Sequence, residues 1–237
     1  MTYGALYHNL SELEQILMLI EHNHRMRSYL LKIIHKILDL FFPITCLICN
    51  EPGPDLCKTC LTNLKWPKRT KHAWITSLWN YRDPHVETLM RHIKNVPNHR
   101  LAGIFAQLFS ARILNRPTQP ETWIIIPIPI SNKRFRERGY NQAEILARPI
   151  SQLFYFPLIN NVLVKKKHTH KQGTSPSKEA RAANVVGAFS VKNTHLITKK
   201  NIILIDDILT TGATLSEARA TLLKAGAKRV LALTIAN

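Results

Sequence analysis

The sequence predicts an α/β protein in which helices flank a parallel β-sheet and a small cysteine module comes first. Short apolar runs rich in β-branched residues alternate with segments of helical periodicity, and this alternation is typical of a parallel, doubly wound sheet. All four cysteines fall between Cys46 and Cys60, so they indicate a separate compact module. A chain of 237 residues is long enough for one medium α/β domain and such a module.

The expected elements follow from two kinds of pattern. Strands are expected where short apolar runs are bounded by turn residues or helical segments, over residues 73–81, 123–128, 161–165, 188–191, 202–205 and 230–235. Helices are expected where apolar residues recur with helical spacing, over residues 84–94, 100–114, 141–153, 177–184 and 215–225, the last closed by Gly226 at its C′ position. Residues 131–139 and 166–177 are expected to be loops of low order.

We expect three regions along the chain. Residues 1–27 include a loose helical pattern and are expected to be an extension that is weakly ordered or not native, with Met26 as an alternative start. Residues 28–70 combine the cysteine module with an amphipathic helix over 28–42, which Pro43 ends. Residues 71–237 form the α/β domain.

The most informative segment is NIILIDDILTTGAT, over residues 201–214. Its apolar residues 202–205 predict a buried strand, and Asp206 and Asp207 follow at the carboxyl end, where open α/β sheets bind ligands. A turn rich in hydroxyl groups then leads into a helix that is expected to begin near Leu215. Backbone N–H groups at a helix N-terminus bind phosphate, and carboxylates accept hydrogen bonds from a sugar's vicinal hydroxyls. The segment therefore predicts a site for a ribose phosphate.

The cysteine spacing is C-x2-C, seven residues, C-x2-C, formed by Cys46, Cys49, Cys57 and Cys60. Two such pairs can place four thiolates around one zinc ion, and such a site is structural because it leaves no open position for water. Disulfides are the alternative in a small secreted protein, and a redox role for one pair would leave the other pair unexplained. His72 lies nearby in the sequence but is not needed as a ligand.

The net charge of +18 predicts attraction to polyanions such as nucleic acid, phosphorylated ligands or anionic membranes. The excess is concentrated in residues 131–171, which hold nine Lys or Arg and only two acids; the alternative is a basic surface that serves solubility. No stretch reaches 18 uninterrupted apolar residues, so we expect no stable membrane insertion. Charges within residues 29–42 argue against a secretory signal, and the expected location is the cytoplasm.

A second dense motif, IPIPISNKRFRERGYNQAE, covers residues 126–144. A strand ends in prolines, a basic loop follows, and Gly139 permits a tight turn into the next helix. Loops that follow different strands of a parallel sheet can meet over its carboxyl edge, so this loop is expected to face the ligand of the acidic segment. The guanidinium fork suits phosphate oxygens, and the candidate anion contacts are Lys133, Arg134, Arg136 and Arg138.

The acidic segment resembles the signature with which type I phosphoribosyltransferases bind phosphoribosyl pyrophosphate (PRPP). Taken with the four-cysteine knuckle and the 126–144 motif, the chain resembles the ComF family of competence-associated, phosphoribosyltransferase-like proteins (ComFC-type, also called GntX-like) over residues 26–237. The resemblance implies a type I phosphoribosyltransferase-like sheet with an N-terminal zinc ribbon or knuckle. It also implies a link to the uptake of single-stranded DNA in natural transformation.

The resemblance also implies roles for individual residues. Asp206 and Asp207 would hold the ribose hydroxyls, and the 5-phosphate would lie in the turn made by Thr210, Thr211, Gly212, Ala213 and Thr214. Mg²⁺ would accompany PRPP, Zn²⁺ would be structural, and the basic loop would face the pyrophosphate. Segment 163–172 carries lysines where relatives favour arginine, so it keeps the charge but loses the bidentate fork. Further candidate contacts are Gln172 and Arg181.

Three functions fit these residues. The first is transfer of a 5-phosphoribosyl group from PRPP to an acceptor with release of pyrophosphate, which magnesium and the basic loop would neutralise; Asp207 is the candidate general base. The second is a non-catalytic PRPP or nucleotide sensor, since fold alone does not decide activity. The third is a factor that handles single-stranded DNA through residues 131–171 and the cysteine module, alongside DNA-uptake or helicase machinery.

Overall fold

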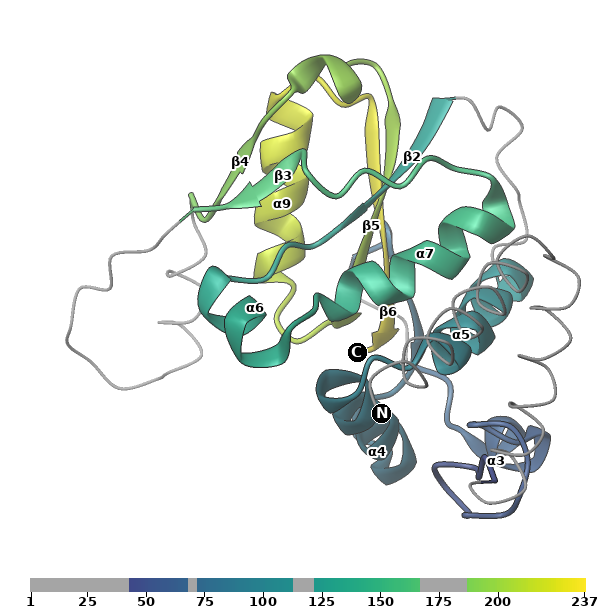
Figure 1. Cartoon of the computed structure of the whole chain (residues 1–237). Coiled ribbons are helices and arrows are strands. Elements are labelled where there is room, and N and C mark those ends of the chain that lie inside the picture. The colour runs from purple at the N-terminus through teal and green to yellow at the C-terminus, as the bar shows by residue number, and fades with distance from the viewer. Residues whose placement is uncertain (1–42, 68–71, 113–121, 167–186) are drawn as a thin grey trace, which may run out of the picture. The chain divides into compact units, whose positions relative to one another are not determined.

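A computed structural model describes residues 43–67, 72–112, 122–166 and 187–237 (Figure 1). The chain forms two compact units, residues 1–46 with 50–54 and residues 47–49 with 55–237. Every helix and strand named below belongs to the second unit. The helices expected over 1–25, 28–42 and 177–184 lie outside the described residues, as do Met26, Gln172, Arg181 and nearly all of the expected loop 166–177.

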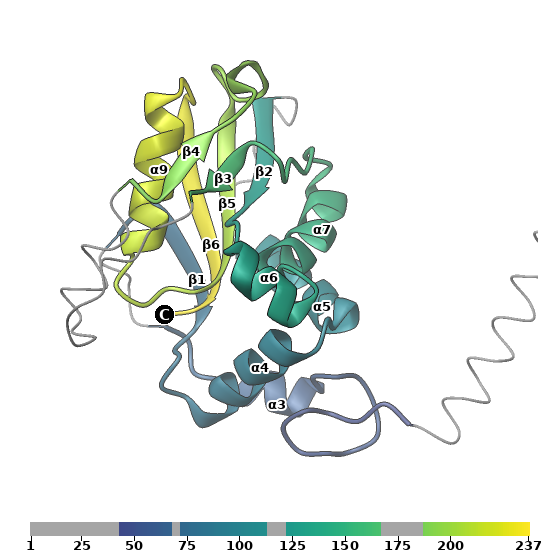
Figure 2. The same ribbon diagram turned by 60° about the vertical axis from the view of Figure 1, so that its left-hand side comes forward.

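The second unit contains a four-stranded parallel sheet with the order β1-β6-β5-β2 (Figure 2). Register aligns Ile125, Ile203 and Leu231 across three neighbouring strands. The predicted parallel sheet is confirmed, and all of its strands lie at or within two or three residues of their expected positions: β1 Ile75–Trp79, β2 Trp123–Pro127, β5 Asn201–Ile208 and β6 Arg229–Ala236.

Helices cover both faces of this sheet, with α9 on one side and α5 and α7 on the other (Figure 2). Side chains of β5 alternate between the two cores, because successive residues of a strand point to opposite faces. Ile203 and Ile205 join one core, and Ile202 and Leu204 join the other. The helices are α4 Pro84–Asn95, α5 His99–Arg112, α7 Gln142–Phe154 and α9 Ala213–Lys224.

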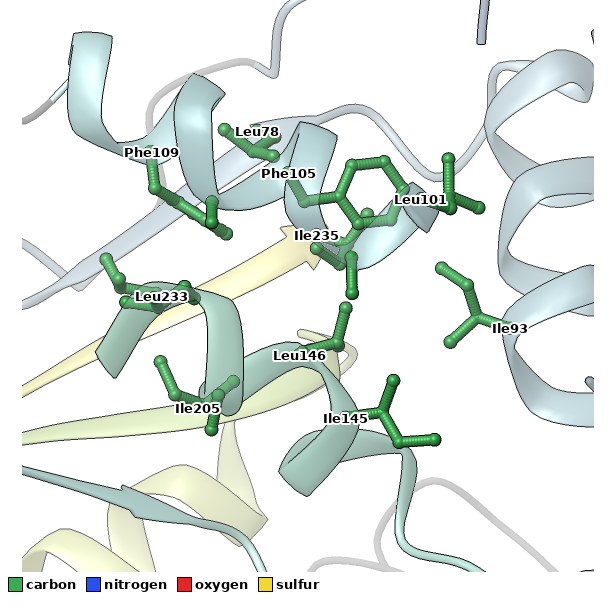
Figure 3. Close-up of a cluster of buried hydrophobic side chains, with 14 of the residues drawn as sticks. Leu78, Ile93, Leu101, Phe105, Phe109, Ile145, Leu146, Ile205, Leu233 and Ile235 are labelled. Carbon is green, nitrogen blue, oxygen red and sulfur yellow. The ribbon is translucent and has the colours of Figure 1, made fainter. Parts of the chain in front are cut away.

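The larger core packs α5 and α7 onto the sheet (Figure 3). Leu101 and Phe105 of α5 and Leu146 of α7 are almost completely buried, together with Ile205 and Leu233 of the sheet. Each such side chain contributes about 1.5–3 kcal/mol by leaving water. This packing fixes the N-terminus of α7 beside the carboxyl end of β5, where the acidic pair lies.

Strand β5 is longer than its apolar run predicts. It continues through Asp206 and Asp207 to Ile208, so the two acids are strand residues and do not follow the strand. The extension arises because β6 stays paired with it, with Asp206 opposite Thr234 and Ile208 opposite Ala236. Helix α9 begins two residues earlier than expected, directly after Gly212.

The prediction that residues 131–139 form a loop is wrong, because most of them form helix α6, Asn132–Arg138. The Ser131 side chain caps the helix by accepting a hydrogen bond from the Arg134 N–H at 3.3 Å. Gly139 ends it in the left-handed conformation at φ 78°, which glycine adopts without strain. Residues 132–137 are all exposed, so α6 has no apolar face that sequence periodicity could reveal.

The strands expected over 161–165 and 188–191 exist, but they do not extend the parallel sheet. They form β3 Leu163–Lys165 and β4 Phe189–Val191, an antiparallel pair of their own. A three-residue strand is too short to show in sequence whether its partner is parallel or antiparallel. Two short helices complete the described elements: α3 Lys58–Asn63 and η2 Thr194–Leu196.

Candidate functional site

Two adjacent carboxylates lie at the carboxyl end of β5 and are half-buried. The Asp207 N–H donates to Asp206 Oδ1 at 2.9 Å, and the Ile208 N–H donates to Asp207 Oδ1 at 2.8 Å. The pKa of Asp206 is raised well above its usual range, mainly by burial and secondly by the charge of Asp207. The charge of Lys165 lowers the pKa of Asp206.

The N-terminus of α7 is tied to the ends of two strands. Asn141 caps the helix by accepting from the Ala143 N–H at 3.1 Å, and its own amide donates to the carbonyl of Ile128, just beyond β2, at 3.1 Å. The neighbouring Gln142 is buried, and its Nε2 donates to Asp207 Oδ2 at 3.3 Å. The helix that follows the basic loop therefore contacts the acidic segment at the carboxyl ends of the strands.

Lys165 of β3, in the separate two-stranded sheet, acts electrostatically on the acidic pair through Asp206. Burial lowers the pKa of Lys165, the charge of Arg134 lowers it further, and the charge of Asp206 raises it. These influences place Lys165 within electrostatic range of both residues. The Lys165 Nζ also lies 5.9 Å from the centre of the Phe189 ring. Lys165, within the segment 163–172, therefore acts on the charge of Asp206.

The hydroxyl-rich turn lies between β5 and the N-terminus of α9. Thr210 and Thr211 are exposed, and Thr211 Oγ1 accepts from the Ala213 N–H at 3.3 Å. Gly212 has a φ of +79°, and a Cβ placed on it would lie 3.0 Å from Nε2 of His72. Sequence spacing does not indicate that His72 lies at this turn, because the position of His72 depends on how the chain folds before β1.

Helix α6 carries the four candidate anion contacts, but they differ in their surroundings. Lys133 is exposed and lies 4.0 Å from Glu137 of the same helix, and Arg134 and Arg136 are also exposed. Arg138 is half-buried, and its buried Nη1 atom has no hydrogen-bond partner within the described part of the chain. A buried donor without a partner is costly, and this sets Arg138 apart from the other three.

The four cysteine sulfurs all lie within 4.8 Å of one another. The Sγ atoms of Cys49 and Cys57 are 3.8 Å apart, which matches the edge of about 3.8 Å expected for a tetrahedron with Zn–S bonds of about 2.3 Å. The Cys60 N–H also donates to Cys57 Sγ at 3.4 Å, at the start of α3. These residues could hold a metal ion such as zinc.

Comparison with known proteins decides the family. Residues 138–237 match the family model of the phosphoribosyl transferase domain. Over 187 residues the chain is 30% identical to competence protein ComFC of Bacillus subtilis, an alignment that covers 76% of this chain and 72% of that protein. The chain belongs to the ComF family. The resemblance seen in the sequence is therefore confirmed, as is the α/β fold with a preceding cysteine cluster.

Two further relatives match over shorter stretches. Competence protein F of Haemophilus influenzae is 36% identical over 107 residues, which cover 45% of this chain and less than half, 46%, of that protein. DNA utilization protein YhgH of Escherichia coli O157:H7 is 24% identical over 150 residues, covering 62% of this chain and 65% of that protein.

Among the described residues, no helix combines the length and apolar character that a transmembrane span needs.

Proposed function

We propose that this ComF protein binds PRPP at the carboxyl edge of its parallel sheet. The ribose hydroxyls would be held by Asp206 and Asp207, and the 5-phosphate by the turn over residues 210–214. The pyrophosphate would face α6 through Lys133, Arg134, Arg136 and Arg138. Mg²⁺ would arrive with the pyrophosphate and neutralise part of its charge.

The observation that carries this proposal is the convergence of opposite charges at one edge. Two acids on β5 lie within reach of Gln142 and Lys165, and an exposed hydroxyl turn leads directly into a helix of 12 residues. Carboxylates alone would suit a cation, and a helix N-terminus alone would suit an anion. A phosphorylated sugar with a free diol satisfies both halves.

The direct test is calorimetric titration with PRPP and Mg²⁺, comparing the unaltered protein with Arg138→Ala and Arg136→Ala. We expect saturable binding, and a larger loss of affinity for Arg138→Ala because its guanidinium has the unsatisfied buried donor. Absence of PRPP binding by the unaltered, folded protein would refute the proposal. Release of pyrophosphate with a defined acceptor would add enzymatic transfer, with Asp207 as the candidate base, whereas binding without turnover would indicate a sensor.

A second candidate function is the handling of single-stranded DNA in natural competence, together with DNA-uptake or helicase machinery. Two observations favour it: the names of the relatives refer to competence and DNA utilization, and the charge of +18 suits a polyanion. We expect binding that weakens steeply with salt and is reduced by Arg134→Ala, on the exposed face of α6. Binding that is insensitive to salt would exclude this role.

We further propose that the cysteine cluster holds a structural Zn²⁺. Four thiolates close the coordination sphere of zinc and leave no position for catalytic water. Reduced thiolates of this kind are typical of the cytoplasm, which is the location that we propose.

A further inference from the structure

The buried side chain of Gln142 is not explained by folding alone. It is only 6% exposed, and its Oε1 atom is buried without a hydrogen-bond partner among the residues that the structure describes. Burying an amide with half of its polar atoms unsatisfied destabilises a fold. An unbranched apolar residue of similar volume at this first position of α7 would pack without that penalty.

What the glutamine does provide is a contact with the acidic pair. Its Nε2 donates to Asp207 Oδ2 at 3.3 Å, while the Ile208 N–H donates to Asp207 Oδ1 at 2.8 Å. Both oxygens of Asp207 therefore have a donor, and the plane of this carboxylate is fixed.

The glutamine is itself held firmly, which a positioning role requires. The adjacent Asn141 anchors the start of α7 to the carbonyl of Ile128, and Leu146, one turn further along the helix, is buried in the main core. The amide therefore projects from a rigid helix terminus, and a group held in this way can orient a partner more precisely than one on a loop.

We propose that Gln142 is a positioning residue of the ribose site, which orients Asp207 to accept hydrogen bonds from a vicinal diol. This inference rests on the proposed PRPP function and extends it, since it assigns discrimination of the diol to a residue outside the acidic strand. Gln142 would lower the stability of the fold but orient the carboxylate of Asp207. Its replacement by methionine should leave the fold as stable or more stable while it weakens recognition of the diol.

The test compares two ligands in four proteins: the unaltered chain, Gln142→Met, Gln142→Glu and the control Leu146→Met. Ribose 5-phosphate carries the diol, and 2-deoxyribose 5-phosphate lacks one of its hydroxyls. We expect Gln142→Met to lose about tenfold in affinity for ribose 5-phosphate, as fits one hydrogen bond to a charged group, with little change for the deoxy sugar. Gln142→Glu should lose more, because two carboxylates would then face each other, and Leu146→Met should bind as the unaltered protein does.

Thermal unfolding of the same four proteins separates positioning from packing. An unchanged or raised Tm for Gln142→Met, together with the selective loss, would support the inference. An unchanged preference for ribose over deoxyribose in Gln142→Met, or a lowered Tm with both ligands weakened equally, would overturn it and leave the proposed function intact. Failure of the unaltered protein to bind ribose 5-phosphate would also overturn the inference, and the proposed function would fall with it only if the unaltered protein did not bind PRPP with Mg²⁺ either.

Discussion

A side chain at Gly212 would crowd the imidazole of His72. A Cβ built on Gly212 would lie 3.0 Å from His72 Nε2 and 3.4 Å from a methyl carbon of Leu209, and the backbone there has a φ of +79°. The glycine therefore meets two separate demands, a left-handed backbone and close packing. Both shape the turn in which we propose that the phosphate binds.

Gly212→Ala should destabilise the protein by at least about 1–2 kcal/mol, the usual cost of a left-handed conformation for a residue with a Cβ. Adding His72→Ala to Gly212→Ala should recover the share of the lost stability that is due to crowding. It should not recover the share that is due to the left-handed backbone. Urea unfolding of the two single variants and the double variant measures this coupling. Full recovery in the double variant would show that backbone strain is negligible, and no recovery would show that His72 does not crowd the turn.

Asp206→Asn should stabilise the protein at neutral pH. The pKa of Asp206 is raised by burial and by Asp207, so the folded state binds its proton more tightly than the unfolded state does. The stability associated with protonated Asp206 is complete below the unfolded pKa of about 3.9 and is lost as pH rises through the folded pKa. The advantage of Asp206→Asn should therefore be absent near pH 3 and grow as pH rises, until it levels off above the folded pKa.

Thermal melts of Asp206→Asn across pH measure this difference, and each kcal/mol should appear as about 2–4 °C in Tm. Glu87→Gln is the matched control, because Glu87 is an exposed acid that pairs with Arg91 of the same helix. Its effect should be small and nearly independent of pH. An Asp206→Asn variant that is less stable than the unaltered protein at pH 7 would show that the charge of Asp206 does not destabilise the folded state.

The sequence predicts the strands of the sheet well, and the reason is physical. The run Ile202–Ile205 is buried on both faces, so its apolar character is continuous and visible in any window. Helix α6 is invisible to the same test because no residue of it is buried. Helix α6 begins after the cap Ser131 and ends at Gly139. The hydrophobic periodicity of the sequence does not reveal these two capping roles.

The sequence indicates which residues are candidates for the site, but it does not indicate which of them contact one another. The acids, the hydroxyl turn and the basic motif are found from local spacing alone. Gln142 and Asp207 lie 65 positions apart in the chain, and Lys165 reaches Asp206 from a separate sheet. Such contacts depend on how helices and hairpins pack, which single-sequence periodicity does not encode.

Asn98 should matter more to stability than Arg100, although both contact Asp55. The buried Asp55 carboxylate accepts from Asn98 Nδ2 at 2.6 Å and from Arg100 Nε at 3.0 Å, and Asn98 Oδ1 also accepts from the Leu101 N–H at 2.9 Å. We expect Asn98→Ala to cost about 1.5–3 kcal/mol. Arg100→Ala should cost about 1 kcal/mol or less because the arginine side chain is 65% exposed. Urea unfolding gives the order, and the reverse order would contradict this description of the contact.

Cys57→Ser should remove the metal and destabilise the cysteine module, because a neutral hydroxyl is a poor replacement for a thiolate ligand. Elemental analysis should find about one zinc per chain in the unaltered protein and much less in the variant. Thr59→Ser, an exposed change on the same helix, should keep the metal. PRPP affinity should persist in Cys57→Ser, since the proposed ribose site lies on other elements. Equal zinc content in Cys57→Ser and the unaltered chain would rule out this ligand set.

The most direct measurement is calorimetric titration of PRPP with Mg²⁺ into the unaltered chain and into a variant that carries both Asp206→Ala and Asp207→Ala, with circular dichroism as the check on folding. We expect saturable binding by the unaltered chain and a loss of at least about a hundredfold in the folded double variant, as fits the removal of two charged hydrogen-bond acceptors. A double variant that binds PRPP as tightly as the unaltered chain would show that the ribose lies elsewhere.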